Sequence, residues 1–299
     1  MLTRRGVMGG VMSGLVVLPA AGCSGAAKIS RAGDFAAGMI DIQRRHGGRI
    51  GVCAIDHATG ARLSVSSDQR FAMCSVFKWL LATAVLAGVD AGRLNLAQTV
   101  AYGRGDLLDW APVTGQHVGE GKLSLAMLCA AAVSQSDNTA ANLLLPLIGG
   151  PAGLTAYVRS LGDTVTRFDR TEPDLNSNID GDPRDTTTPE AMAQLLQTVF
   201  TGTALKPESL DQLKTWMVAT TTGKKRIAAA VPAGWTVGDK TGTANTACND
   251  VAVIWPAQAA GKTRGPISLA VLTSGGGLDA DGRNAVIADT ARLVLEAMA

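Results

Sequence analysis

Apolar and polar residues alternate near the start of the chain, before a longer apolar segment takes over. Two β-rich runs, 49–56 and 61–66, are separated by a hairpin signal that ends at Gly60. An amphipathic helix is predicted just before them, over 34–45. The following pattern is helical, and 76–89 is apolar on nearly every side. A helix without a polar face is predicted to be buried all round.

Helix start signals divide the middle of the chain. Capping residues or prolines predict helices that begin at Leu125, Asn138, Pro151, Pro189 and Pro207. The last third returns to β-rich runs and then ends in a helix. These segments are 235–243, 250–255, 267–273 and the helix 281–298.

This order of elements predicts an α+β fold. Since short connections keep sequential strands adjacent, the early and late strands should share one antiparallel sheet flanked by helices. The middle helices should form a separate all-helical lobe. We place the α/β lobe at 28–68 and 214–299 and the helical lobe at 69–213, intertwined in a single domain.

Composition narrows the range of functions. The 299 residues carry a net charge of +2, and 46% of them are hydrophobic, as in an ordinary globular protein. Because no basic stripe is present, we expect no nucleic-acid partner. The histidines are scattered at no ligand spacing, so we expect no metal site of the zinc kind. Beyond the N-terminal segment, no apolar run approaches the roughly 18 residues of a membrane span.

Residues 1–27 are expected to be an export signal. Arg4 and Arg5 precede a soft apolar stretch that ends near Cys23, as in a signal peptide, and the paired arginines are similar to a twin-arginine address. The residues before Cys23 resemble a lipoprotein box, but Ala20 stands where Leu is usual. A lipid anchor at Cys23 and plain cleavage nearby stay open as alternatives. We expect a monomer in the bacterial periplasm or at the cell surface.

The mature region retains four cysteines. Export permits disulfide bonds, and four cysteines allow three full pairings, whereas buried free thiols are the simpler alternative. The sequence leaves both open for Cys53, Cys74, Cys129 and Cys248.

A serine and a lysine three residues apart open the apolar helix. Because such residues share a helical face, the Lys78 amine should meet the Ser75 hydroxyl. A serine is a poor nucleophile until a neighbour accepts its proton, which a lysine can do if burial lowers its pKa. A helix cap followed by a surface lysine is the alternative. However, Lys78 is the only charged residue between Arg70 and Asp90, which favours a buried functional amine.

Two further polar clusters interrupt the predicted elements. Ser136 and Asn138 lie between two helices and could relay a proton and hold a substrate amide, or simply cap the second helix. The run Lys240-Thr241-Gly242-Thr243 lies inside a strand, where a lysine is unusual. It could bind a carboxylate, with Gly242 admitting a substrate backbone, or it could form a strand-end turn.

A long aperiodic loop over 171–187 carries the last cluster. A loop of this length in a compact domain is usually functional or disordered. Glu172 could be a general base beside the serine, with Asn176 sharing its water, and Pro173 permits a cis peptide that would aim the carboxylate inward. The alternative is a polar surface loop.

Together, in this order and spacing, the motifs resemble the signature set of the penicillin-recognising serine enzymes. The Glu-x-x-Leu-Asn loop is similar to that of the class A serine β-lactamases in particular. The resemblance spans the mature chain. It implies an antiparallel sheet packed on an all-helical lobe, with the active site in the cleft between them. The implied function is hydrolysis of penicillin-type antibiotics, which gives resistance without a cofactor.

The resemblance also implies the catalytic roles. Ser75 would attack the β-lactam carbonyl, and the backbone N–H groups of Ser75 and Thr243 would form the oxyanion hole. Either Lys78 or Glu172 would take the serine proton. Which of the two does so during acylation is disputed across the family. Glu172, with Asn176, would then activate the water that hydrolyses the acyl-enzyme.

Other roles concern the substrate. Ser136 would pass a proton to the leaving nitrogen, and Asn138 would bind the substrate side-chain amide. The substrate carboxylate would be held by Lys240, Thr241 and Thr243.

Two residues resemble those of carbapenem-hydrolysing members: Arg226, which would reinforce carboxylate binding, and Trp110 at the cleft mouth. Cys74 also matches, but its usual disulfide partner is replaced by Ala244 and the following loop is short. A Cys74–Cys248 bridge is a speculative alternative. Carbapenem turnover is therefore a hypothesis.

Two rival functions share the same serine. A cell-wall DD-peptidase would be acylated but would release the drug slowly, and Glu172 with Asn176 argues against it. A non-catalytic drug sensor would stay acylated, and the chain contains no recognisable signalling domain beside these motifs.

Overall fold

The computed structural model describes residues 25–258 and 264–299. The predicted export signal, with Arg4, Arg5 and Cys23, therefore lies almost entirely outside the described residues. In the described part of the chain, no single helix is long and apolar enough to cross a membrane. One pair of helices, 138–148 and 150–160, has the required length and apolar composition when taken together, but the pair is sharply bent.

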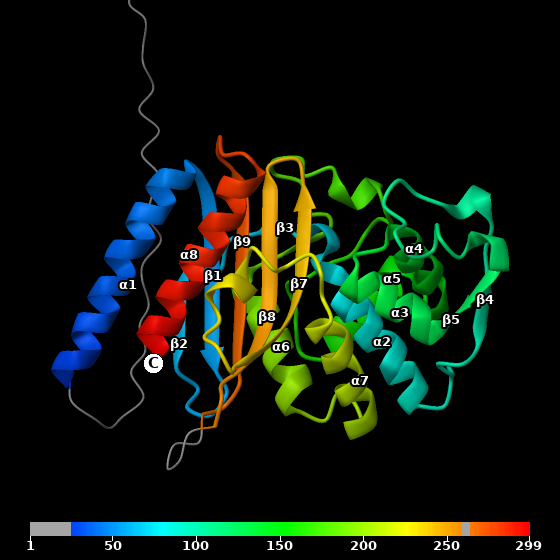
Figure 1. Ribbon diagram of the computed structural model, residues 1–299, viewed down its shortest axis with the longest axis horizontal. Coiled ribbons are helices and arrows are strands. Elements are labelled where there is room, and N and C mark those ends of the chain that lie inside the picture. Colours follow the sequence, from blue (N-terminus) through cyan, green and yellow to red (C-terminus); the bar gives the residue numbers. More distant parts are fainter. Residues whose placement is uncertain (1–24, 259–263) are drawn as a thin grey trace, which may run out of the picture.

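A five-stranded antiparallel sheet forms one side of the molecule (Figure 1). Its order is β2-β1-β9-β8-β7, so the first strands pair with the last. The register of β1 and β9 runs from Gly48 opposite Gly275 to Asp56 opposite Ile267. The predicted union of early and late strands in one sheet is confirmed. The strands are β1 (Gly48–Asp56), β2 (Arg62–Val65), β7 (Thr236–Ala244), β8 (Ala247–Trp255) and β9 (Ile267–Gly275).

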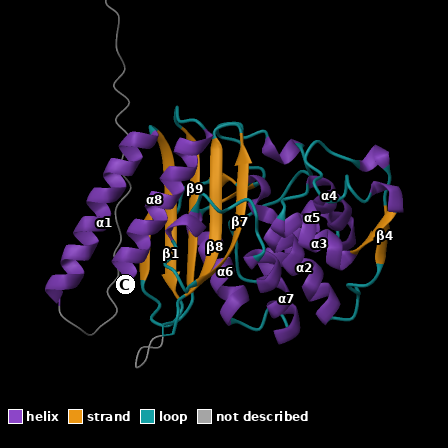
Figure 2. Ribbon diagram, viewed as in Figure 1, coloured by secondary structure: helices purple, strands orange, loops and turns teal. Residues whose placement is uncertain are grey.

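Helices cover both faces of this sheet. On one face, α1 (Gly25–His46) and α8 (Ala280–Met298) lie side by side and share a hydrophobic core with alternate residues of the central strands (Figures 1 and 2). The other face packs on α6 (Pro189–Thr201), which contacts β1 and β9. Because side chains alternate along a strand, each face of the sheet supplies a separate core. The lobe boundaries, between residues 68 and 69 and between residues 213 and 214, stay a prediction. Helix α6 falls within the predicted helical lobe, yet it packs against the sheet of the other lobe.

The remaining helices surround α2 (Lys78–Asp90). Most of its side chains are buried, as its lack of a polar face predicted, because helices α3, α4, α5 and α7 pack around it. The surrounding helices are α3 (Leu125–Ser134), α4 (Asn138–Leu144), α5 (Gly150–Ser160) and α7 (Pro207–Val218). Two small antiparallel pairs complete the strands: β3 (Phe71–Ala72) with β6 (Thr186–Thr187), and β4 (Thr99–Ala101) with β5 (Lys122–Ser124).

Local structure differs from the predictions in three places. The first turn after Met73 is a 3₁₀ helix, η1 (Cys74–Phe77), that leads into α2. The predicted helix 138–148 ends in a 3₁₀ turn, η4 (Leu145–Ile148), beside Pro146, whose nitrogen carries no hydrogen to donate. Strand β8 begins three residues earlier than predicted, because Asn245 adopts φ +49° and permits a two-residue turn.

Candidate active site

Lys78 occupies the centre of the candidate site. Its side chain is fully buried, and its Nζ lies 2.9 Å from each of Ser75 Oγ, Ser136 O and Glu172 Oε1. It also donates to Asn138 Oδ1. Burial lowers the pKa of Lys78, while the neighbouring Glu172 carboxylate opposes that shift. The predicted meeting of Ser75 and Lys78 is thus present, and the amine has more oxygen neighbours than an ammonium has protons.

The serine stands on a turn of unusual backbone geometry. Cys74, just before it, has a φ of +49°, and this left-handed residue leads into η1. Strand β7 closes against the same turn at Gly242. A Cβ on that residue would lie 2.5 Å from Met73 O and 3.0 Å from Val76 N. Glycine is therefore required at position 242 because the protein's own backbone lies close to it. The sequence had suggested a different reason, the close approach of a substrate backbone.

Glu172 reaches the serine from the loop between α5 and α6. Its Oε1 lies 3.3 Å from Ser75 Oγ, and Asn176 Nδ2 donates to its Oε2 at 2.6 Å. The peptide bond between Glu172 and Pro173 is cis, as the sequence permitted. Glu172 and Asn176 thus bracket a position beside the serine where a water could be activated.

Asn142 is a positioning residue that the sequence argument missed. It donates to Glu172 O at 2.8 Å and accepts from Glu172 N at 3.0 Å. Both bonds hold the backbone of the candidate base. A signal was present, since Asn142 follows Asn138 by four residues and so shares its face of α4.

The ends of the loop are joined by an ion pair, which the sequence argument also missed. Arg170 Nε lies 2.6 Å from Asp185 Oδ2, and Asp185 Oδ1 accepts from the backbone N–H groups of Asp169 and Arg170. These bonds close the neck of the loop and fix where Glu172 projects.

Lys240 and Ser136 face each other across the cleft. Lys240 Nζ donates to Ser136 Oγ at 3.0 Å and to Thr241 O at 2.8 Å. Burial and the positive charge of Lys78 lower the pKa of Lys240 well below its usual value. Ser136 adopts φ +60°, and Asp137 beside it caps α4 by accepting from Ala140 N. Capping and active-site placement, which were alternatives in the sequence, therefore coexist.

Arg226 braces the open edge of β7. Its Nη2 donates to Thr243 Oγ1 at 2.6 Å, its Nη1 to Asn249 O at 2.7 Å and its Nε to Asn284 Oδ1 at 2.8 Å. Thr222 Oγ1 lies 2.6 Å from Thr241 Oγ1. Thr222 and Asn284 are further members of this edge that the sequence argument missed, since no local motif marks them.

The resulting cleft has a volume of about 350 Å³. Trp110, 54% exposed, stands in its wall and donates from Nε1 to Gln135 O. The structure gathers the predicted site residues around this cleft: Ser75, Trp110, Ser136, Asn138, Asn176, Arg226, Thr241 and Thr243 line it together with Thr222. Among the predicted residues, Lys78, Glu172 and Lys240 are buried beneath the lining, and Gly242 packs on η1.

The four cysteines of the mature region are free thiols in the described structure. The suggested Cys74–Cys248 bridge is absent, because each sulfur faces a different partner. Cys74 Sγ lies 3.6 Å from Asn178 Nδ2, whereas Cys248 Sγ lies 3.9 Å from Asn284 Oδ1. Burial raises the pKa of Cys74 to about 12, so this thiol stays protonated and unreactive.

Comparisons with known proteins agree with this geometry. A family model described as "Beta-lactamase enzyme family" matches residues 35–298. The carbapenem-hydrolyzing β-lactamase KPC of Klebsiella oxytoca is 46% identical over 259 residues, which cover 86% of each chain. β-Lactamase CTX-M-8 of Citrobacter amalonaticus is 42% identical over 268 residues, covering 89% of this chain and 90% of the relative.

Solved structures show the same fold. The class A β-lactamase of the last common ancestor of Gram-negative bacteria superposes with a TM-score of 0.85 at 53% identity, covering 89% of this chain and 99% of that chain. A β-lactamase from Xanthomonas campestris superposes with a TM-score of 0.85 at 46% identity, covering 89% of this chain and 97% of that chain. This chain therefore belongs to the class A serine β-lactamases, hydrolases that open the β-lactam amide.

Proposed function

We propose that this enzyme hydrolyses penicillin-type antibiotics through a covalent acyl-enzyme on Ser75. The observation that carries the proposal is the close grouping of three atoms. Ser75 Oγ lies 2.9 Å from Lys78 Nζ and 3.3 Å from Glu172 Oε1, and the last two atoms lie 2.9 Å apart. A proton leaving the serine therefore has two bases within reach, connected to each other.

In the acylation step, Ser75 attacks the β-lactam carbonyl as its proton passes to Lys78 or Glu172. Burial lowers the pKa of Lys78 and so favours an amine able to accept that proton. Ser136 Oγ, hydrogen-bonded to Lys240 Nζ, delivers a proton to the ring nitrogen as the amide bond breaks. The backbone N–H groups of Ser75 and Thr243 are assigned to the oxyanion.

In the deacylation step, Glu172 removes a proton from a water that attacks the acyl carbonyl. Asn176 donates to the other carboxylate oxygen and orients it. Asn142 fixes the backbone at Glu172, which keeps the carboxylate aimed at the serine. This second step separates a β-lactamase from a DD-peptidase or a drug sensor, in which the acyl-enzyme persists.

Substrate binding is assigned to the cleft walls. Lys240, Thr241 and Thr243 hold the substrate carboxylate, and Arg226 reinforces that subsite through Thr243. Asn138 binds the side-chain amide, and Trp110 contacts the substrate at the mouth.

The test follows nitrocefin hydrolysis and intact protein mass together in the mature domain. A Glu172→Ala variant should lose about 10²–10⁴-fold in kcat and accumulate a Ser75 adduct, because its water lacks a base. Glu296→Ala is the matched control, since it removes an exposed carboxylate from α8, and it should behave as the parent does. A parent that takes up one drug molecule and then stalls would instead indicate a penicillin-binding or sensor protein.

We further propose that turnover extends to carbapenems. Arg226 on Thr243 and Trp110 at the mouth support it, as does similarity to a relative named for carbapenem hydrolysis. The absent bridge at Cys74 weighs against it. Purified enzyme should clear imipenem as well as benzylpenicillin. If imipenem stays intact while benzylpenicillin disappears, the extension is wrong.

Export and a monomeric state remain part of the proposal. Arg4, Arg5 and Cys23 support a twin-arginine signal, with either a lipid anchor at Cys23 or plain cleavage. The intact mass of protein recovered from periplasmic and membrane fractions distinguishes a lipid anchor at Cys23 from plain cleavage. A protein of full length in the cytoplasm would contradict export, and gel filtration tests the monomer.

A further inference from the structure

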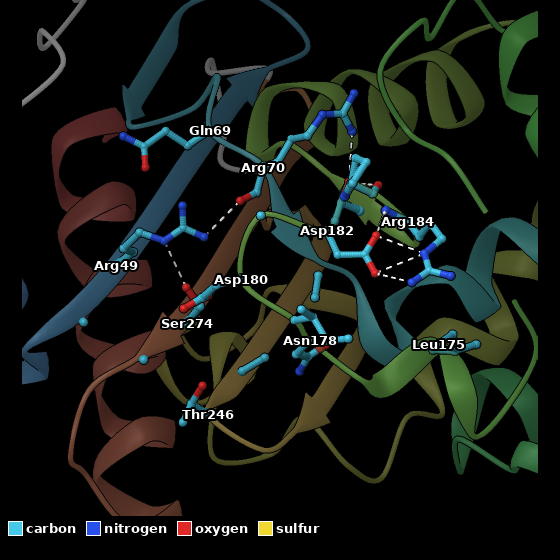
Figure 3. A pocket seen from close by; sticks show the side chains of 18 of the residues that line it. Arg49, Gln69, Arg70, Leu175, Asn178, Asp180, Asp182, Arg184, Thr246 and Ser274 are labelled. Carbon is cyan, nitrogen blue, oxygen red and sulfur yellow. Dashed lines mark hydrogen bonds and ion pairs between the residues drawn. The ribbon is translucent and has the colours of Figure 1, made fainter. Parts of the chain in front are cut away.

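A second, larger cavity lies behind the loop that carries Glu172 (Figure 3). We call it the rear cavity. Its volume is about 750 Å³, within the range of small-molecule sites. Its walls come from Leu175 and loop residues 178–184, from the ends of β1 and β9, and from the turn between β7 and β8. None of the residues that line the candidate cleft lines the rear cavity.

The lining of the rear cavity is rich in arginine. Two of its four arginines are already neutralised: Arg170 pairs with Asp185, and Arg184 pairs with Asp182 at 2.7 Å. The other two, Arg49 and Arg70, have no carboxylate within ion-pair distance among the described residues. Their hydrogen bonds go to hydroxyl groups and backbone carbonyls.

Arg49 is held in place without being neutralised. Its Nε donates to Ser274 Oγ at 3.1 Å, and its Nη2 donates to Arg70 O at 3.0 Å (Figure 3). Its guanidinium also stacks over the Phe71 ring, 4.7 Å from the centroid. A cation fixed in this way loses little conformational entropy when it binds an anion.

Arg70 is fixed in a similar manner. Its Nη1 donates to Thr186 Oγ1 at 2.9 Å and its Nη2 to Val165 O at 3.0 Å. Asp180 also lines the cavity, so with Arg170 neutralised by Asp185 and Arg184 by Asp182, the remaining Arg49, Arg70 and Asp180 leave an excess of one positive charge. An anion that accepts charge-assisted hydrogen bonds from guanidinium groups would suit that excess.

We propose that the rear cavity binds a small anion, bearing either a phosphate or carboxylate groups, at Arg49 and Arg70. Such a site is separate from the proposed hydrolysis, because the anion site uses none of the residues assigned to that reaction. The ligand would lie against the back of the catalytic loop. Asn178, which lines the cavity, ties that loop to β7 by donating to Ala244 O at 3.0 Å.

The test measures binding of inorganic phosphate and of succinate by isothermal titration calorimetry, at constant ionic strength. The parent should bind at least one of them saturably, and the two probes distinguish a phosphate ligand from a dicarboxylate. Arg49→Gln should weaken binding by about tenfold or more, because a charge-assisted contact is lost. Arg44→Gln is the matched control, since it removes the same charge from a side chain of α1 that is 78% exposed, and its affinity should equal that of the parent.

Two further variants keep the outcome decisive. Arg49→Lys retains the charge and should bind more tightly than Arg49→Gln, and melting curves check that both variants fold. Arg226→Gln removes a cation of the candidate cleft and should leave binding unchanged. Affinity that falls with Arg226→Gln but not with Arg49→Gln would put the anion in the cleft and overturn the proposal. So would a parent that shows no saturable binding at tens of millimolar anion.

Discussion

Lys78 and Lys240 are two fully buried amines in different electrostatic settings. Lys78 lies 2.9 Å from the Glu172 carboxylate, whereas Lys240 donates to a hydroxyl and a backbone carbonyl. Burial lowers the pKa of both, and the nearby positive charge of Lys78 lowers that of Lys240 further. A lysine assigned to hold a substrate carboxylate must keep its proton, so the depressed pKa of Lys240 sets an upper pH limit on that task.

The first prediction concerns this pH limit. As pH rises through the depressed pKa of Lys240, the ammonium loses its proton and its attraction for the substrate carboxylate. The KM for benzylpenicillin should therefore rise on the alkaline side. In Lys240→Arg the guanidinium stays charged, so the rise in KM should become much shallower. Steady-state kinetics over a series of alkaline pH values measure the KM of the parent and of the variant. An identical rise in KM in parent and variant would show that another group is responsible.

At the scale of elements, β7 and η1 must approach closely for Thr243 and Ser75 to line the same cleft. Gly242 makes this approach feasible, because any Cβ there would lie 2.5 Å from the Met73 carbonyl oxygen, which is part of the backbone and cannot turn away. The nucleophile turn and the strand therefore act as one unit in the proposed oxyanion hole.

The second prediction follows from that contact. Gly242→Ala should push β7 away from η1, lower the unfolding free energy by about 1–3 kcal/mol, and reduce kcat beyond the loss of stability. Urea unfolding and nitrocefin kinetics measure the two effects. Gly103→Ala is the control, since a Cβ there would meet no atom within 4 Å. Equal kinetics and stability in the two alanine variants would contradict the proposed contact.

At the scale of the whole molecule, α1, β9 and α8 meet around a buried histidine. His46 is 1% exposed, and neither ring nitrogen has a hydrogen-bond partner among the described residues. Burial lowers its pKa, and the charge of Arg283 on α8 lowers it further. The ring is packed so closely that a Cβ on Gly276 would lie 3.0 Å from its Nδ1. Folding therefore favours the uncharged ring.

The third prediction is a pH dependence of stability. Because the folded-state pKa of His46 is below its unfolded value, the unfolded chain binds a proton that the folded chain does not. The unfolding free energy should thus be highest above about pH 6.5 and should fall as pH drops through the depressed pKa, by at most about 1.4 kcal/mol per pH unit. His46→Leu should make this slope shallower in urea unfolding series. A slope as steep in the variant as in the parent would rule out His46 as its source.

The sequence was sufficient for most of the elements and for the main residues of the site. Hydrophobic periodicity and capping residues predicted the elements because both act over a few residues, as Ser124 and Thr188 show by capping α3 and α6. The buried amine was recognisable too, since a lone lysine in an apolar helix requires partners. Lys78, Ser75 and Glu172 do lie together.

Other members of the site could not be predicted because their roles depend on contacts between distant segments. Asn284 reaches Arg226 across 58 positions, and Asp185 closes the loop neck on Arg170. No local pattern indicates either of these contacts. The cysteines illustrate the same limit, because the directions of the Cys74 and Cys248 side chains are set by packing.

The sequence by itself therefore determined which chemical groups this protein has and which short segments carry them, because propensity, periodicity and motif spacing are local properties. Only the tertiary structure decided how those groups meet: that Gly242 abuts the nucleophile turn, that Asn142 braces Glu172, and that Arg49 and Arg70 line a cavity with no ion-pair partner among the described residues. The physical reason is that distance, burial and electrostatic balance arise only when segments remote in sequence pack together.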